Sequence, residues 1–336
     1  MILVTGGTGL VGAHLLYKLV ENNELVKAIY RNENSLNNVK QVFQSYTNNY
    51  EALYQNINWV KADILDIPSL TKAFEDVTLV YHCAAFVSLE PSKYYLLRRT
   101  NIEGTANIVN LCIDKQVKKF CYVSSISTLG TAINGEMITE NTFWNPEGDN
   151  SVYGITKYGA EMEVWRATQE GLDTVMVNPG VILGAGIWHS GSSSLFKRAH
   201  KGIPFFTKGT IALVAVEDVV AIMIKLMQSN IQNERFLVVA ENWSYKRFLQ
   251  HLAMAVKQKP PTKLASPLLL NIIWRLDWLI NKLTGKPRRL TKHVSKSLQK
   301  EKYYSSEKIE KALNYSFKPI DSTITSLGEH YLKQVE

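Results

Sequence analysis

Six short apolar runs, rich in β-branched residues, alternate with amphipathic segments of helical period over roughly the first 180 residues. This alternation is typical of parallel strands joined by crossover helices. A doubly wound sheet of this kind binds its ligand over the carboxyl ends of the strands. The runs are residues 1–6, 24–31, 57–64, 78–85, 118–125 and 173–180, and we expect helices over 11–21, 34–52, 69–75, 101–115 and 157–170.

A glycine-rich turn joins the first predicted strand to the first predicted helix, in the sequence MILVTGGTGLVG. Gly6, Gly9 and Gly12 have the spacing that a tight turn, close approach of a pyrophosphate and close helix-to-strand packing require. The free amides at the start of the helix would hold the phosphates. A purely structural turn is the alternative. On the phosphate interpretation, the cofactor contacts Gly6, Thr8, Gly9, Leu10, Val11 and Gly12.

The pattern changes after Pro179, and the chain of 336 residues is long enough for a second, smaller unit. Residues 209–227 predict a strand and a helix that returns to the main sheet, and residues 234–240 predict one more strand. From Asn242 onward the pattern is helical. We therefore predict an α/β fold, a Rossmann-type doubly wound parallel sheet with a smaller, mostly helical C-terminal substrate lobe. The dinucleotide-binding domain would comprise residues 1–182, with 208–240 returning to it, and the substrate lobe 183–207 and 241–336.

The second strand ends on a cation, in the sequence AIYRN at residues 28–32. A carboxylate at this place would bind the ribose 2'-hydroxyl of NAD(H), whereas an arginine can pair bidentately with a 2'-phosphate. Arg31 therefore favours NADP(H) over NAD(H). A solvent-exposed arginine at a strand end is the alternative.

A third motif is YVSSIS, at the end of the fifth strand, followed by YGITK at residues 153–157. Tyr153 and Lys157 are four residues apart and so lie on one face of a helix, where the ammonium can lower the pKa of the phenol. A serine from the preceding strand end would hydrogen-bond a reacting carbonyl. Such a tyrosine and lysine often occur by chance, but their combination with the serine pair and the glycine turn predicts an oxidoreductase.

With these motifs, the chain resembles the extended short-chain dehydrogenase/reductase family, within the NAD-dependent epimerase/dehydratase superfamily, over at least residues 1–240. The glycine spacing matches the extended branch of that family. Further landmarks follow in the expected order. They are KADI at residues 61–64, HCAA at 82–85, Asn101 before EGT, and NPGV at 178–181.

The resemblance implies a role for each matched residue. Tyr153 would be the general acid/base, and Lys157 its pKa partner and a ribose ligand. Ser125 would orient the carbonyl, Ser124 would contact the cofactor, and Asn101 would complete the catalytic set. No metal is expected. Further cofactor contacts would come from Asp63 and Ile64 at the adenine, from Ala84 and Ala85 after the fourth strand, and from Pro179 and Val181 beside the nicotinamide.

Within the family, the chain is most similar to dihydroflavonol reductase-like and 3β-hydroxysteroid dehydrogenase-like enzymes. This implies reduction of a ketone or aldehyde, or oxidation of the alcohol, on a medium-sized, rather apolar molecule. Ser125 lacks the acidic pair that follows it in sugar-nucleotide dehydratases, and residues 209–218 lack the arginine with which nucleotide-sugar epimerases bind a diphosphate. Glu217 and Asp218 are read as the start of a helix. An epimerase is the second hypothesis and a non-catalytic NADP(H)-binding redox sensor the third.

Composition and cysteine usage favour the cytoplasm. Apolar residues make up 46% of the chain and charged residues 20%, as in ordinary globular proteins. Met1 is followed by no secretory signal pattern, and the three cysteines have neither metal-ligand nor disulfide spacing. We expect a small-molecule substrate and no nucleic-acid partner. The resemblance further implies a homodimer through the helices that carry Asn101 and Tyr153.

Much of the net charge of +8 lies near the C-terminus. A solvated helical face is the simplest interpretation, and an anionic substrate or a membrane surface is the alternative. The residues are Lys282, Lys286, Arg288, Arg289, Lys292, Lys296, Lys300 and Lys302, against Glu301 alone.

Just before this basic stretch, residues 264–283 are almost long enough to span a bilayer. Arg275 and Asp277 interrupt the apolar run, so a spanning helix is not expected. We expect instead a buried or dimer-forming helix of the substrate lobe, carrying Trp274 and Trp278. An interfacial helix, supported by the basic stretch, is the alternative.

Overall fold

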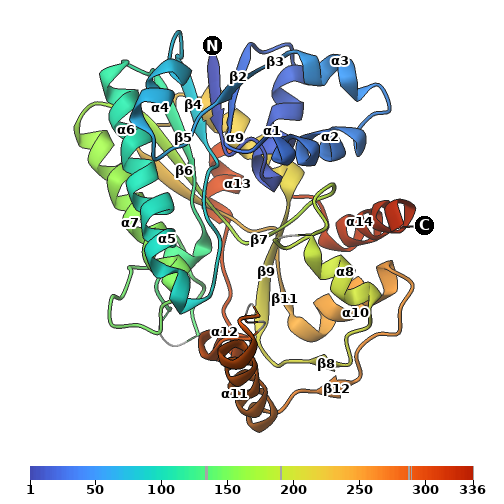
Figure 1. Cartoon of the computed structure of the whole chain (residues 1–336). Coiled ribbons are helices and arrows are strands. Elements are labelled where there is room, and N and C mark those ends of the chain that lie inside the picture. Colours follow the sequence, from blue (N-terminus) through green and yellow to red (C-terminus); the bar gives the residue numbers. More distant parts are fainter. Residues whose placement is uncertain (133–134, 190, 287, 289, 336) are drawn as a thin grey trace.

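The computed structural model describes residues 1–132, 135–189, 191–286, 288 and 290–335. Within these residues, the centre of the molecule is a seven-stranded sheet whose neighbouring strands all pair in parallel (Figure 1). The first strand lies inside the sheet, and the chain builds first towards one edge and then towards the other. The predicted doubly wound fold is confirmed. The order across the sheet is β10 (Glu234–Val238), β6 (Thr174–Pro179), β5 (Lys119–Val123), β4 (Leu79–His82), β1 (Ile2–Thr5), β2 (Val26–Tyr30) and β3 (Ile57–Lys61).

Helices cover both faces of the main sheet, which explains why its strands are continuous apolar runs. In β1, Ile2 and Val4 join the core layer on one face, and Leu3 joins the layer on the other. The first layer contains α1 (Leu10–Glu21), α2 (Leu36–Gln44), α3 (Tyr50–Gln55) and α9 (Val216–Gln228); the second contains α4 (Ile67–Ala73), α6 (Gly104–Asp114) and α7 (Val152–Gln169).

The helix predicted over residues 34–52 is in fact two helices. A short 3-10 turn, η1 (Glu33–Ser35), leads into α2, and residues 45–49 separate α2 from α3. In this gap the Ser45 hydroxyl donates to the carbonyl of Val42 at 2.6 Å, and the Thr47 hydroxyl accepts from the amide of Asn49 at 3.3 Å. Such local bonds compete with helix formation and end α2, although the apolar spacing continues.

A three-stranded sheet adjoins the main one within the described residues. In it, β9 (Thr210–Ala215) pairs in parallel with β7 (Val181–Leu183) and antiparallel with β11 (Glu241–Ser244). Gly180 lies between β6 and β7, and a Cβ on it would be 2.7 Å from the carbonyl oxygen of Ala212 in β9. Only glycine therefore allows the two backbones to approach so closely. Within the predicted returning segment, residues 208–240, β9 thus belongs to the small sheet, whereas α9 packs in the core of the main sheet and β10 joins that sheet.

The smaller part of the molecule is mostly helical and has its own apolar core. Phe196, Trp243, Phe248, Ile324 and Tyr331 are members of this core. Its elements are α8 (Ser194–His200), α10 (Tyr245–Ala255), α11 (Pro267–Thr284), α12 (Lys292–Ser297) and α14 (Ile320–Val335), with the paired strands β8 (Phe205–Phe206) and β12 (Lys263–Leu264).

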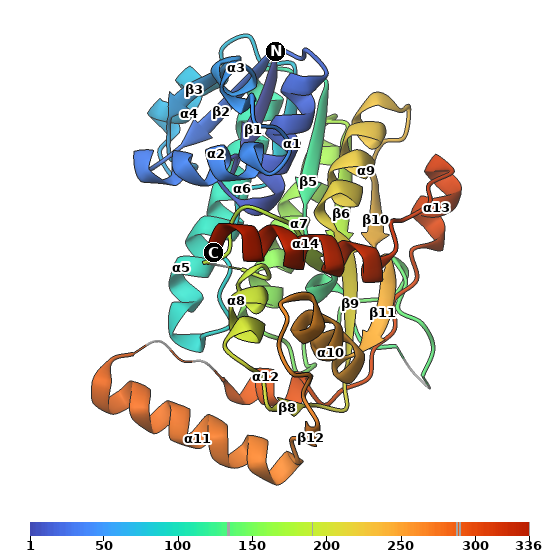
Figure 2. The same cartoon turned by 90° about the vertical axis from the view of Figure 1, so that its right-hand side faces the viewer.

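One C-terminal helix, α13 (Glu307–Leu313), lies against β10 and α9 of the main sheet (Figure 2), although we assigned residues 241–336 to the substrate lobe. Ile309 is buried there in the core. The hydroxyl of Tyr315 donates to Asp218 at 2.7 Å, and the amide of Lys318 donates to the same carboxylate at 3.0 Å. Asp218 thus lies in the first turn of α9 and also anchors the returning segment.

Helix α11 lies along one edge of the molecule (Figure 2). Among its described side chains, only Leu270 is buried, so of the two expectations the buried helix is wrong and the dimer-forming helix stays a prediction. Its apolar residues belong neither to the main core nor to the core of the smaller part. Across the described residues, no helix combines the length and hydropathy needed to cross a membrane.

Candidate active site

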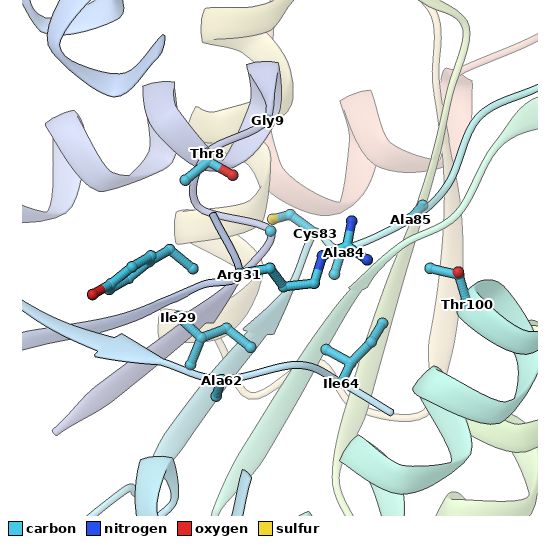
Figure 3. A pocket seen from close by; sticks show the side chains of 12 residues that line it. Thr8, Gly9, Ile29, Arg31, Ala62, Ile64, Cys83, Ala84, Ala85 and Thr100 are labelled. Atoms are coloured by element: carbon cyan, nitrogen blue, oxygen red, sulfur yellow. The ribbon is translucent and has the colours of Figure 1, made fainter. Parts of the chain in front are cut away.

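A pocket lies over the carboxyl ends of β1, β2 and β4, where the strand order reverses (Figure 3). In an open α/β sheet, this is where ligands bind. Residues from the predicted cofactor set that line it are Gly6, Thr8, Gly9, Arg31, Ile64, Ala84 and Ala85. The lining also contains Ile29, Tyr30, Ala62, Cys83 and Thr100, which were not in that set. Outside this lining are Leu10, Val11, Gly12, Asp63, Ser124, Tyr153, Lys157, Pro179 and Val181.

The glycine turn is shaped by two close backbone approaches. Gly6 has φ +67°, and a Cβ there would lie 2.5 Å from the amide nitrogen of Ala84. A Cβ on Gly12 would lie 2.2 Å from the carbonyl oxygen of Gly6. Both positions therefore require glycine. In contrast, a Cβ on Gly9 would meet only the Gly6 carbonyl oxygen at 3.4 Å, so its side of the turn is open to a ligand.

The start of α1 suits an anion. Gly9 is its N-cap and offers no side-chain hydrogen bond to the first turn. The amides of Leu10, Val11 and Gly12 therefore have no partner one turn earlier in the helix, as a phosphate-binding helix start requires. An open glycine turn, an uncapped helix start and a pocket at the point of strand reversal together fit the pyrophosphate of a dinucleotide.

Arg31 lines the pocket from the end of β2, and Figure 3 shows its side chain extending towards the middle of the pocket. Its Nη1 lies 3.8 Å from Oδ2 of Asp63, and both side chains are largely exposed. An exposed pair of this length contributes little to stability. The other oxygen of Asp63 accepts from the amide of Leu65 at 3.0 Å, which fixes the carboxylate at the end of β3. The guanidinium therefore remains available to an anionic ligand.

Ser125 and Tyr153 meet beyond the end of β5. Ser125 caps η4 (Ile126–Thr128) by accepting from the amide of Ser127 at 3.2 Å. Tyr153 lies in the first turn of α7, which is fixed by a bond of 2.9 Å from the amide of Gly154 to the hydroxyl of Ser151. Burial raises the pKa of Tyr153 to about 12, and a hydrogen bond with Ser125 opposes this rise. The phenol is therefore protonated at neutral pH.

Lys157 is buried one helical turn after Tyr153, but its ammonium contacts another tyrosine. Its Nζ donates to the hydroxyl of Tyr122 at 2.6 Å and to the carbonyl of Val123 at 2.8 Å. Burial lowers the pKa of Lys157 to about 7, while the nearby carboxylate of Glu161 opposes this shift. The sequence pattern predicted the face of the helix but not Tyr122, which lies next to the carboxyl end of β5.

Glu161 is a fully buried carboxylate that the sequence analysis did not single out. Its Oε1 accepts from the hydroxyl of Thr128 at 2.8 Å and from the amide nitrogen of Asn178 at 2.6 Å. The hydroxyl of Ser124 also donates to it, and Arg235 lies 3.3 Å from Oε2. Ser124 therefore faces the core here. The sequence feature that points to Glu161 is its position four residues after Lys157, which places both residues on the same face of the helix.

Asn101 lies inside a π-helical turn, η3 (Arg99–Glu103), that follows η2 (Pro91–Lys93) and α5 (Tyr94–Arg98). Its amide is fully used: Oδ1 accepts from the amide of Phe86 at 2.8 Å, and Nδ2 donates to the carbonyl of Phe86 and the hydroxyl of Thr156, both at 3.0 Å. Such turns often occur at functional sites. Asn101 thus joins the segment after β4 to the helix of Tyr153, and its catalytic role stays a prediction.

The remaining predicted residues lie where β6 passes into the small sheet. Pro179 ends β6, and Val181 begins β7 on the other side of Gly180. The described residues contain no cluster of three or more histidine, cysteine or acidic side chains that could hold a metal ion. The candidate site consists of the pocket over the strand ends and, outside its lining, Ser125, Tyr153 and the buried Lys157.

Comparison with protein families decides what kind of enzyme this site belongs to. Residues 2–240 match the model of the NAD dependent epimerase/dehydratase family. The chain belongs to this family. It is therefore an enzyme of the extended short-chain dehydrogenase/reductase type, whose members are oxidoreductases and epimerases that use a nicotinamide dinucleotide. The resemblance inferred from the motifs is confirmed.

Relatives within the epimerase/dehydratase family include both reductases and epimerases. The chain is 28% identical over 313 residues to a putative dihydroflavonol 4-reductase of Synechocystis sp., covering 91% of this chain and 87% of that protein. It is 29% identical over 271 residues to sterol demethylase protein B of Methylococcus capsulatus, covering 79% and 77%. A UDP-glucose 4-epimerase of Thermotoga maritima, solved with UDP-glucose, has a TM-score of 0.77 at 20% identity, over 100% and 99% of the two chains. This last similarity establishes the fold alone.

Proposed function

We propose that the chain is an NADP(H)-dependent reductase of a ketone or aldehyde on a medium-sized, rather apolar molecule, or a dehydrogenase of the corresponding alcohol. The observation that carries this proposal is the placement of Tyr153 and the buried Lys157 one turn apart on α7, with the ammonium of Lys157 fixed by Tyr122 and Val123. The dihydroflavonol reductase and sterol demethylase relatives support an apolar, polycyclic substrate. Arg31, which lines the pocket just after β2, supports NADP(H).

A bound nicotinamide dinucleotide would supply the hydride, so the chain itself must supply the proton and polarise the carbonyl oxygen. Tyr153 is suited to the proton transfer, because burial keeps its phenol protonated at neutral pH. Ser125 already lies in contact with that phenol and can donate to the oxygen that gains negative charge. A positive charge on Lys157 would lower the pKa of the phenol as the proton leaves.

Lys157 is held for this task by Tyr122 and Glu161. The hydroxyl of Tyr122 and the carbonyl of Val123 fix its ammonium, and the carboxylate of Glu161 favours its charged form. Glu161 is itself fixed by Thr128 and Asn178, so the same network supports the loop that carries Ser125. We therefore assign Glu161 and Asn101 to positioning rather than to proton transfer.

Oxidation of NADPH by the purified protein tests this proposal. A dihydroflavonol, a ketosteroid and small aldehydes are offered as substrates, and loss of nicotinamide absorbance is followed beside identification of the alcohol product. We expect turnover with at least one apolar carbonyl compound and a preference for NADPH over NADH. Conversion of UDP-glucose to its C4 epimer, without net use of cofactor and without turnover of any carbonyl compound, would replace the proposal with the epimerase hypothesis.

A further inference from the structure

Helix α11 presents an apolar stripe to solvent. The stripe residues recur at intervals of three and four, which places them on one side of the helix. Their exposed fractions run from 37% for Ile273 to 75% for Leu283. A contiguous apolar surface of this kind is a mark of an interaction site. The stripe consists of Leu268, Ile272, Ile273, Leu276, Leu279, Ile280 and Leu283.

The opposite side of α11 attaches the helix to the rest of the protein. Leu270 is buried, and Asp277 accepts from the amide of Leu290 at 3.1 Å. Arg288 lies 3.7 Å from the same carboxylate and donates to the carbonyl of Trp274 at 3.3 Å. Because these contacts fix the polar side inward, the apolar stripe points away from the protein. Figure 2 shows the helix at the outer edge of the molecule.

The surroundings of the stripe are strongly basic. Between residues 263 and 300 the chain has nine lysines and arginines and one acid, Asp277. Two of the nine, Lys296 and Lys300, pair with Asp149 at 3.6 and 3.2 Å. Arg275 lies 4.6 Å from the ring centre of Trp274, and Lys282 lies 5.4 Å from that of Trp278. Lysines and tryptophans beside an apolar stripe are typical of helices at a membrane interface. Of the nine, Arg289 lies outside the described residues.

We propose that α11 docks on an anionic lipid bilayer, with its apolar stripe in the acyl boundary and the basic side chains on the headgroups. The helix lies in the interface plane and does not span, since Arg275, Asp277 and Asn281 interrupt it. An anionic bilayer offers both the apolar interior and the negative charge that this surface complements. A second copy would bring a stripe with the same positive charges, and their repulsion opposes self-association.

Two matched pairs of variants test the docking. Leu276→Glu and Leu283→Glu place a charge on the stripe, at side chains 53% and 75% exposed. Met254→Glu and Leu25→Glu are their controls, because those side chains are 54% and 73% exposed elsewhere on the surface. All four should unfold at the same temperature as the parent chain, since none of these positions is buried. Thermal unfolding therefore separates lost docking from lost folding.

Binding is measured by sedimentation with vesicles of phosphatidylglycerol and phosphatidylcholine, and with vesicles of phosphatidylcholine alone. We expect binding to the anionic vesicles only, a drop of roughly tenfold or more for each stripe variant, and no change for the controls. The double variant Lys282→Glu/Lys286→Glu should bind the anionic vesicles more weakly, by about fivefold or more for each lysine replaced. Added salt should also weaken binding, because it screens the attraction between the basic side chains and the headgroups.

Three outcomes would overturn the proposal. The first is absence of binding to either vesicle, and the second is equal binding to both. The third is a dimer in light scattering that Leu276→Glu dissociates while vesicles leave the parent chain in solution, because the stripe would then be covered by a second copy. None of these readouts depends on the substrate or on NADPH, so the docking and the proposed reductase activity can fail separately.

Discussion

The phenol of Tyr153 is the group whose loss should separate chemistry from cofactor binding. Tyr153→Phe removes the proton that we assign to the carbonyl oxygen but leaves the ring and its packing. We expect kcat to fall by about 10²–10⁴-fold, the usual contribution of a general acid, with unchanged affinity for NADPH. Steady-state kinetics and nicotinamide fluorescence measure the two effects.

A control for this variant lies on the same helix. Tyr158→Phe removes a hydroxyl from a ring that stacks on Trp144 at 4.7 Å, outside the Ser125 contact. It should leave kcat close to that of the parent chain. Full activity in Tyr153→Phe, or an equal loss in both variants, would remove the proposed acid.

Arg31 should decide between the two nicotinamide cofactors. Its only ion pair among the described residues is the long, exposed one with Asp63, so Arg31→Ala costs the fold little. A charge-assisted bond to a phosphate is worth about 1.5–3 kcal/mol, which predicts a loss of roughly ten- to a hundredfold in NADPH affinity. NADH affinity should hardly change.

The neighbouring cation at the end of β3 provides the matched control for Arg31. Lys61 lies 3.9 Å from Glu33 and is similarly exposed. Lys61→Ala should affect NADPH and NADH alike and only weakly. Equal losses of both cofactors in Arg31→Ala would exclude the 2'-phosphate assignment.

At the scale of elements, two glycines of one turn should respond differently to the same methyl group. Gly12→Ala places a Cβ 2.2 Å from the Gly6 carbonyl oxygen, which forces α1 away from β1. We expect a loss of stability of about 1–3 kcal/mol, as for other overpacked sites. Gly9→Ala, at 3.4 Å, should fold normally but bind NADPH poorly, since the methyl group occupies the open side of the turn. Urea unfolding and cofactor titration distinguish these losses; equal stability of the two variants would contradict the packing argument.

The six strands and the glycine turn could be predicted because each is a local pattern. The start of α1 and the ends of the strands follow from such patterns and from the rule that parallel strands end at one edge. The break between α2 and α3 was missed, since Ser45 and Thr47 end the helix by side-chain bonds while the apolar spacing continues.

Contacts between distant segments could not be predicted in this way. Tyr122 meets Lys157 across 35 positions, and Arg235 meets Glu161 across 74. The same holds for β7, β9 and β11, which form a separate sheet because the chain bends at Gly180 beside Ala212. The exposure of α11 is also a property of the whole fold, since an apolar stripe looks alike in sequence whether it is covered or not.

At the scale of the whole molecule, two buried histidines should make stability depend on pH. His14 is hydrogen-bonded to Tyr46 at 2.6 Å and to the carbonyl of Ala185 at 3.1 Å, so it joins α1 to the start of the smaller part. Burial lowers the pKa of His14 to about 4 and that of His82 to about 3. The unfolded chain binds protons at these residues from about pH 6.5 downward, and the folded chain does not.

Stability should therefore be complete above pH 7 and decrease as the pH falls from 6.5 towards 4, by up to about 3 kcal/mol for His14 alone. Urea unfolding across this range measures the slope. His14→Gln removes one titrating ring and should flatten the slope, whereas His189→Gln, at an exposed position, should not. A slope that is unchanged in His14→Gln would exclude His14 as its source.

Helix α13 has a consequence for how ligands enter and leave. The chain passes from the main sheet to the smaller part at Gly180, returns at α9, leaves again after β10 and comes back once more as α13 before ending in α14. Several crossings of the chain thus connect the two parts. The hydrogen bond from the Tyr315 hydroxyl to Asp218 fixes the last of these crossings. A wide hinge motion would have to stretch all of these crossings at once. Exchange of substrate and product is therefore better served by local movement of surface segments than by opening of the two halves.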